Sequence, residues 1–149
     1  MLYDNGDENV AVTGGWVNGR TYSVNAPYVR TKNSDHLYIQ AEIAGTYRHG
    51  IIQFSTSNKL NYSLYSSAQI DLEVTSINGN GSGSVAVYDN LSGSGGEIVV
   101  AYNSLSRQTV TADISGITST KHFAVGVNTG YLAAPANVAI RVYKIELFE

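Results

Sequence analysis

The residues best suited to chemistry in this chain lie in its turns and near its ends, and the first group is acidic. Asp4, Asp7 and Glu8 surround a glycine-containing turn near the N-terminus, and Glu146 lies close to the C-terminus. Calcium prefers several oxygen ligands, and such a turn lets carboxylate and carbonyl oxygens converge on one ion. These four residues form the predicted calcium site. The alternative is a solvated acidic turn, because Asn-Gly-Asp is also ordinary turn chemistry.

Tyrosine is the second chemical signal, because the chain has 11 tyrosines against 3 phenylalanines. A tyrosine ring offers an apolar face for stacking, and its hydroxyl forms hydrogen bonds, which suits a wet binding surface. Two short segments, residues 47–49 and 128–131, place such a ring beside hydrogen-bond donors in predicted loops. The predicted ligand-binding residues are Tyr47, Arg48, His49, Asn128, Tyr131 and Tyr28. The alternative for each segment is an ordinary polar turn.

The only tryptophan, Trp16, follows two glycines at the start of a predicted strand. An exposed tryptophan there would suit sugar stacking. A tryptophan entering a strand more often anchors the core, with its N–H group paired. We therefore predict that Trp16 is buried.

Catalytic arrangements are scarce in this sequence. The three histidines lack zinc-site spacing, and no metalloprotease, nucleophile-elbow or phosphate-loop motif occurs. Asp71 and Glu73 share one face of a predicted strand, which a pair of glycosidase carboxylates would require. Exposed strand faces routinely carry acids, however, so we predict that the protein is not an enzyme.

The elements that must position these residues are strands, because apolar and polar residues alternate with a period of two. The alternating runs cover residues 37–43, 70–75, 85–88, 98–102, 109–114, 123–127 and 137–148. One of the predicted strand faces consists of Ile98, Val100 and Tyr102. No helical period exists that could cover a parallel sheet, so the pattern predicts an all-β, antiparallel two-sheet β-sandwich or jelly roll.

Local irregularities refine this prediction. In the last run the apolar set shifts by one residue after Val142, so a β-bulge near Tyr143 and Lys144 would return Ile145 and Leu147 to the core face. The alternative is that the strand is covered on both sides there. Glycine-rich segments at residues 78–83 and 90–96 predict hairpin loops, because glycine and asparagine tolerate the positive φ angles of tight turns.

Composition limits the class of protein. The 149 residues suffice for one domain spanning 1–149, either a whole protein or the C-terminal module of a longer one. Only 14% are charged and the net charge is −3, which argues against a nucleic-acid partner. The absence of cysteine excludes disulfides and thiolate chemistry. No apolar run is long enough for a membrane span, and the N-terminus does not look like a signal peptide.

The two ends of the chain also carry a resemblance. Residues Leu2–Glu8, Thr13–Trp16 and Val138–Leu147 resemble the first and last segments of accessory domains in phage and prophage tail or fibre proteins. Those domains are similar to the galactose-binding-like jelly roll of many carbohydrate-binding modules. The resemblance implies that fold, adhesion to surface glycans or a structural role in a virion, and one structural calcium ion near the N-terminal loop.

The function predicted from the sequence is therefore non-catalytic carbohydrate binding, as glycan adhesion by a phage, prophage or bacterial surface protein. The partner would be a glycan or cell-wall polysaccharide, met on a virion or outside the cell, with no nucleic acid and no membrane insertion. One alternative is a structural domain that assembles into a virion or a homo-oligomer. The third hypothesis is a polysaccharide-cleaving enzyme that uses Asp71 and Glu73.

Overall fold

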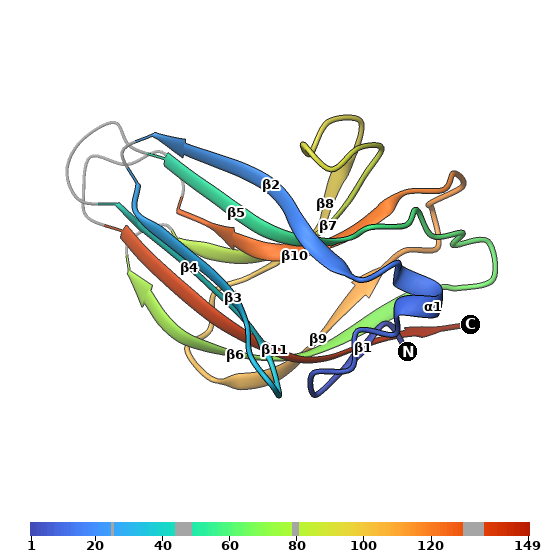
Figure 1. Cartoon of the computed structure of the whole chain (residues 1–149), viewed down its shortest axis with the longest axis horizontal. Helices are drawn as coiled ribbons and strands as arrows, with labels where there is room; N and C mark the ends of the chain where they lie inside the picture. The colour runs from blue at the N-terminus through green and yellow to red at the C-terminus, as the bar shows by residue number, and fades with distance from the viewer. Residues whose placement is uncertain (25, 44–48, 79–80, 130–135) are drawn as a thin grey trace.

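The computed structural model of the chain describes residues 1–24, 26–43, 49–78, 81–129 and 136–149. Two antiparallel β-sheets pack face to face around a hydrophobic core, and both chain ends lie at the same end of this sandwich (Figure 1). The predicted all-β, two-sheet architecture is therefore confirmed. Within the described ranges, no helix has the length and apolar character that a membrane crossing requires.

Each sheet mixes strands from distant parts of the chain. In sheet A the order is β3 (Tyr28–Lys32), β4 (Leu37–Ile43), β11 (Ala136–Phe148), β6 (Ser67–Asn78) and β9 (Arg107–Asp113), and β1 (Tyr3–Asp4) pairs with β11 beyond the end of β4. In sheet B the order is β2 (Trp16–Val24), β5 (His49–Thr56), β10 (His122–Asn128), β7 (Ser82–Tyr88) and β8 (Glu97–Tyr102). The last strand, β11, thus lies at the centre of sheet A.

The core between the sheets follows the predicted alternation. Its buried inward-facing residues include Leu37, Ile39, Ala41, Ile70, Leu72, Val74, Val85, Val87, Val110, Ala112, Phe123, Val125 and Val127. Because a period of two sends every second side chain inward, these positions fix the register of each strand against the core.

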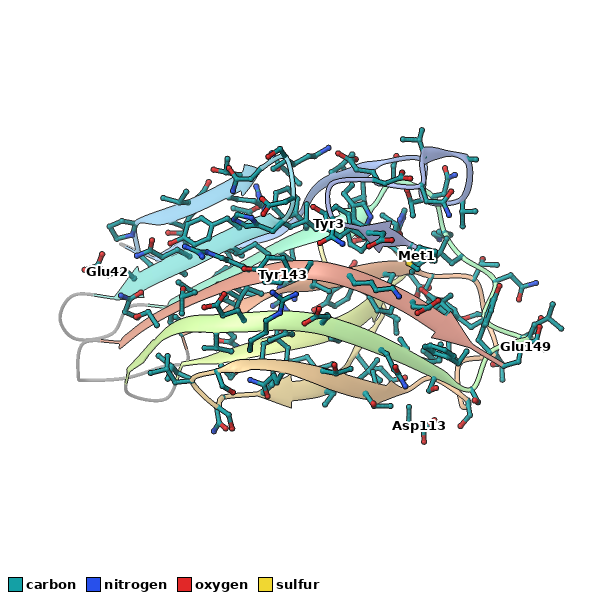
Figure 2. All side chains as sticks on the ribbon, turned by 90° about the horizontal axis from the view of Figure 1, so that it is seen from below. Met1, Tyr3, Glu42, Asp113, Tyr143 and Glu149 are labelled. Carbon is teal, nitrogen blue, oxygen red and sulfur yellow. The ribbon has the colours of Figure 1, made fainter. Side chains whose placement is uncertain are left out.

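The predicted bulge in the last strand is confirmed. The register of β11 against β6 shifts between Val142 and Lys144, which leaves Tyr143 as the extra residue. The insertion returns Ile145 to the core, where it is fully buried. It also places Tyr143 on the outer face of sheet A, as Figure 2 shows.

The topology confirms one predicted hairpin and corrects the other. Residues 90–96 connect the paired strands β7 and β8 and so form the expected hairpin. The glycine-rich segment at 78–83 is not a hairpin, because it leads from β6 in sheet A to β7 in sheet B. Composition identifies a turn there but cannot tell a hairpin from a crossing between sheets.

The predicted common face of β8 is wrong for Ile98. A register shift lies between Val85 and Ala86, so Val100 opposes Val85 of the core while Ile98 opposes Ala86 of the outer face. Ile98 is accordingly 51% exposed. A bulge changes which face a side chain occupies, and the apolar residues on both sides of this one hide it in the sequence.

Trp16 is a core residue, as predicted. It is fully buried, and its ring meets Tyr3 and Phe123 edge to face, at 6.3 Å between ring centres in both cases. Its indole N–H donates to the carbonyl oxygen of Leu2 at 3.1 Å. The short helix α1 (Val10–Thr13) leads the chain from β1 to this residue. Trp16 therefore ties the N-terminal strand to the core.

Buried tyrosines predict a loss of stability at high pH. Burial raises the pKa of Tyr3 to about 12, and burial also raises the pKa values of Tyr62 and Tyr102. The unfolded chain releases these protons near pH 10, whereas the folded chain retains them. The free energy of unfolding should therefore decrease as the pH rises from about 10 towards 12. Urea unfolding at stepped pH measures this slope, and Tyr3→Phe should reduce it. An unchanged slope in that variant would contradict the assignment.

Candidate functional site

The outer face of sheet A carries polar groups that bond to one another (Figure 2). Arg107 donates to both carboxylate oxygens of Asp71, at 3.3 and 2.9 Å, and its guanidinium lies 4.1 Å from the centre of the Tyr143 ring. The Tyr143 hydroxyl donates to Glu73 at 3.0 Å. Both carboxylates of the enzyme hypothesis are thus already engaged by neighbouring side chains, and a ligand would have to displace these bonds.

The outer face of sheet B differs, because small side chains cover its centre. Residues that oppose each other on β5, β10 and β7 form rows across the sheet, about 7 Å apart along the strands. The successive rows are Ile51, Asn128 and Ser82; then Gln53, Gly126 and Ser84; then Ser55, Ala124 and Ala86; and finally His122 and Tyr88. We call the central part, formed by Gln53, Ser55, Ser84, Ala86, Tyr88, Ala124 and Gly126, the sheet B floor.

The side chains of the sheet B floor are covered, and Ala86, Tyr88 and Ala124 form a small second buried cluster there. The floor side chains point away from the core, yet Gln53 is only 1% exposed and Ser84 only 2%. A Cβ atom on Gly126 would lie 2.1 Å from the carbonyl oxygen of Ile52 and 2.5 Å from Cγ of Gln53. The Gln53 side chain therefore lies directly over Gly126, and only glycine leaves room for it.

Two polar groups of the floor lack partners. The Gln53 amide donates to the hydroxyl of Tyr88 at 3.2 Å, but its Oε1 atom and the Ser84 hydroxyl are buried without a hydrogen bond in the described part of the chain. Exchanging the amide oxygen and nitrogen would only transfer the unpaired position to the nitrogen. An unpaired buried polar group costs about 1–3 kcal/mol. A ligand that reached these two groups by displacing what covers them would supply the missing hydrogen bonds.

The loop between β7 and β8 rises from sheet B (Figure 1) and reaches across to β2. Its base is fixed by Lys121, which donates to Asp89 at 2.9 Å and to the carbonyl oxygen of Gly95 at 2.8 Å. The hydrogen bond from Lys121 lowers the pKa of Asp89. The loop touches β2 at Gly93, whose Cβ position would be 2.5 Å from Cδ of Arg20. One end of the floor is thus bounded by a fixed loop.

The strand ends that lead into the two predicted binding loops lie side by side. The backbone N–H of Thr129 donates to the carbonyl oxygen of Gly50 at 2.9 Å, and the N–H of Gly50 donates to Oγ1 of Thr129 at 2.8 Å. The start of β5 and the end of β10, which are far apart in the sequence, therefore meet beside the row formed by Ile51, Asn128 and Ser82.

The predicted ligand residues separate into three groups. Outside the described residues lie Tyr47, Arg48 and Tyr131. His49 begins β5, but its side chain is also outside the described set. Asn128 lies on the outer face of sheet B, between Ile51 and Ser82. Tyr28 lies elsewhere, on the edge strand of sheet A, where it is 44% exposed and 5.9 Å from the guanidinium of Arg30. The structure therefore does not group Tyr28 with Asn128.

The acidic residues of the predicted calcium site have separate surroundings. Asp4 and Asp7 face each other through two backbone hydrogen bonds. Glu8 forms an ion pair with Lys32 at 2.8 Å, and Glu146 is paired with a lysine of its own strand. Among the described residues, no three histidines or acids are grouped so that they could hold a metal ion. Calcium binding remains a prediction of the sequence.

The sheet B floor was not predicted from the sequence. Its signal lies in β7 and β10, where valines or Phe123 alternate with alanine, serine or glycine instead of with charged residues. A strand with small or apolar residues in both phases is covered on both sides. That pattern could have indicated a covered outer face, although it does not reveal which residues contact one another there.

Comparison with known proteins identifies the fold. No known family model and no curated protein sequence matches the chain. A family 11 carbohydrate-binding module from a cellulosomal cellulase of Clostridium thermocellum is similar, with a TM-score of 0.58 at 12% identity, over 89% of this chain and 88% of that one. The same module in complex with a β-1,3-1,4-mixed-linked tetrasaccharide gives a TM-score of 0.56 at 11% identity, over 89% and 88%. A family 29 carbohydrate-binding module gives 0.53 at 11% identity, over 89% of each chain.

Proposed function

We propose that this chain is a non-catalytic carbohydrate-binding module that holds a glycan against the sheet B floor. The observation that carries the proposal is the pair of buried polar groups without partners, Gln53 Oε1 and the Ser84 hydroxyl. The shared fold supports it, because similar structures are carbohydrate-binding modules and one of them was solved with a bound tetrasaccharide. On the outer face of sheet A, Arg107 pairs with Asp71 and Tyr143 pairs with Glu73, and among the described residues Asn137 Oδ1 is buried there without a partner.

The chemistry of the floor suits a sugar. A pyranose ring presents hydroxyl groups at its rim and C–H groups on its faces, so it needs both polar partners and a flat apolar surface. Ala86, Ala124 and Gly126 are small residues between the polar positions, and they are buried, so a sugar would reach them only if the groups that cover them moved aside. Tyr22 on β2 and Ile98 on β8 stand at the two edges of the sheet, 40% and 51% exposed. These edges offer apolar contact to a chain lying across the strands.

The proposed setting follows from the resemblance at the chain ends. The module would act in adhesion, as part of a phage or prophage tail protein or of a bacterial surface protein. Its partner would be a cell-surface glycan or a cell-wall polysaccharide, and its location would be a virion or the outside of a cell. A structural calcium ion would belong to the same proposal.

Binding should depend on the floor and not on the opposite face. We expect Ser84→Ala and Gln53→Ala each to weaken binding of the best glycan about two- to tenfold, because each removes one hydrogen bond to the ligand. A glycan array identifies that ligand, and titration calorimetry measures the change. Gln69→Ala, at an exposed glutamine on the outer face of sheet A, is the matched control and should change nothing. Equal losses in the control and the floor variants would argue against the site.

The alternative is assembly into a larger structure. Exposed apolar side chains occur near the N-terminus, where Met1 is 42%, Val10 63% and Val12 47% exposed. Such a group is typical of surfaces that contact another protein. Light scattering distinguishes the two functions: a stable oligomer that Val10→Ser and Val12→Ser disrupt would favour assembly, whereas a monomer that binds glycan favours adhesion.

A further inference from the structure

One cation beside the sheet B floor is not neutralised. Arg20 is half-buried on β2, and in the described part of the chain its guanidinium makes no hydrogen bond and no ion pair. The nearby pair of Asp89 and Lys121 neutralises itself at 2.9 Å. A guanidinium has five N–H donors in a planar fork, and this one leaves them all available. Arg20 therefore offers a positive charge to any ligand that binds at the floor.

A bulge in β2 brings Arg20 to the floor. Asn18 opposes Phe54 and Thr21 opposes Ile52, so the two residues between them stand opposite the single residue Gln53. Gln53 faces outward, and the first bulge residue, Gly19, also lies on that side, because its Cβ would be 2.8 Å from Cβ of Ser55. Arg20 consequently extends over the outer face, on the strand next to Gln53, whose Oε1 atom is unpaired.

The β7–β8 loop holds the Arg20 side chain in place. A Cβ atom on Gly93 would lie 2.5 Å from Cδ, 2.8 Å from Cγ and 3.0 Å from Cβ of Arg20, so the arginine stem packs against the glycine backbone. Gly93 has a φ of +89°, which strongly favours glycine. Because the stem is confined, less side-chain entropy is lost when the guanidinium binds an anion.

The same row of the sheet supplies the other contacts of an acidic sugar. Gln53, Gly126 and Ser84 lie side by side on β5, β10 and β7, and Arg20 stands beside Gln53 on β2. Two unpaired polar groups and an unpaired guanidinium therefore flank one glycine position. Arginine binds carboxylates and similar oxyanions through two parallel hydrogen bonds, which a neutral sugar hydroxyl cannot match.

We infer that the glycan bound by the sheet B floor carries an anionic substituent, a carboxylate or a sulfate ester, and that Arg20 binds this group. The inference rests on the proposed glycan-binding function and specifies its ligand class. The anion would lie at the β2 edge, and the hydroxyls of the same or the next sugar would meet Gln53 and Ser84. Arg20 then sets specificity, while the floor provides affinity for the sugar ring.

An array of neutral and acidic glycans, followed by titration with matched polymers, tests the inference. The matched pairs are polygalacturonate with its carboxyl-reduced form and dextran sulfate with dextran. The first pair tests whether a carboxylate is bound, and the second pair tests whether a sulfate ester is bound. We expect the strongest array ligands to be acidic and the charged member of one pair to bind at least tenfold more tightly. Arg20→Gln should abolish that preference, and Arg20→Lys should retain part of it, because lysine keeps the charge but loses the planar fork.

Arg107→Gln is the matched charge control. Arg107 is exposed on the outer face of sheet A, and its substitution removes the same charge as Arg20→Gln. It should leave the preference unchanged. If the strongest ligands are neutral and Arg20→Gln binds them normally, the inference is overturned while the proposed function stands. If Arg107→Gln and Arg20→Gln lose equal affinity, the preference is unspecific and the inference also fails. If no glycan on the array binds, the proposed function itself fails.

Discussion

Replacing Trp16 with alanine should lower the free energy of unfolding by about 3–5 kcal/mol, the range expected when a large aromatic side chain is removed from a packed core. Trp16 is fully buried, and its ring contacts Tyr3 of β1 and Phe123 of β10 edge to face. Its removal also leaves the carbonyl oxygen of Leu2 without the indole donor. Urea unfolding followed by circular dichroism measures the change.

Two further variants separate the contributions at this position. Trp16→Phe keeps an aromatic ring but loses the hydrogen bond to Leu2, so it should cost less than the alanine variant. Leu105→Ala changes a side chain that is 62% exposed and should stay within about 0.5 kcal/mol of the parent. A loss below about 1 kcal/mol in Trp16→Ala would show that the N-terminal segment is not anchored through this ring.

The sheets could be predicted from the sequence because local pattern and tertiary burial agree. Where apolar residues alternate with charged or hydroxyl residues, as in β4, β6 and β9, the inward face was predicted correctly. Even the bulge at Tyr143 followed from the sequence, because the apolar phase changes there and only one insertion restores it. At Ile98 the same reasoning failed, because β8 is apolar in both phases and its bulge leaves no trace in the pattern.

The candidate site depends on register between strands that are distant in sequence, which no local pattern contains. Gln53, Gly126 and Ser84 become neighbours only through the pairing of β5, β10 and β7. The tyrosine excess also has a second cause that composition cannot reveal. Tyr62 lies in a connecting segment but is 1% exposed, and its hydroxyl donates to the carbonyl oxygen of Lys121. Part of the tyrosine content therefore serves the core.

Replacing Gly126 with alanine should be the most damaging single-methyl change on the sheet B floor, at about 3 kcal/mol. The new Cβ would lie 2.1 Å from the carbonyl oxygen of Ile52 and 2.7 Å from Cα of Gln53, and both contacts involve the backbone of the neighbouring strand. A flexible side chain could rotate away, but β5 and β10 would have to separate. Thermal and urea unfolding measure the loss, and glycan titration of the folded fraction should show weaker binding as well.

Gly116→Ala is the control, since it adds the same methyl group where no atom lies within 4 Å. Its backbone does not require a positive φ, so alanine should be neutral or stabilise the protein by up to about 1 kcal/mol through the unfolded chain. The difference between the two variants isolates the steric contact from the general effect of replacing glycine. Equal stability of both would mean that β5 can move away from β10 at little cost. The row of Gln53, Gly126 and Ser84 would then be too mobile to hold unpaired polar groups ready for a ligand.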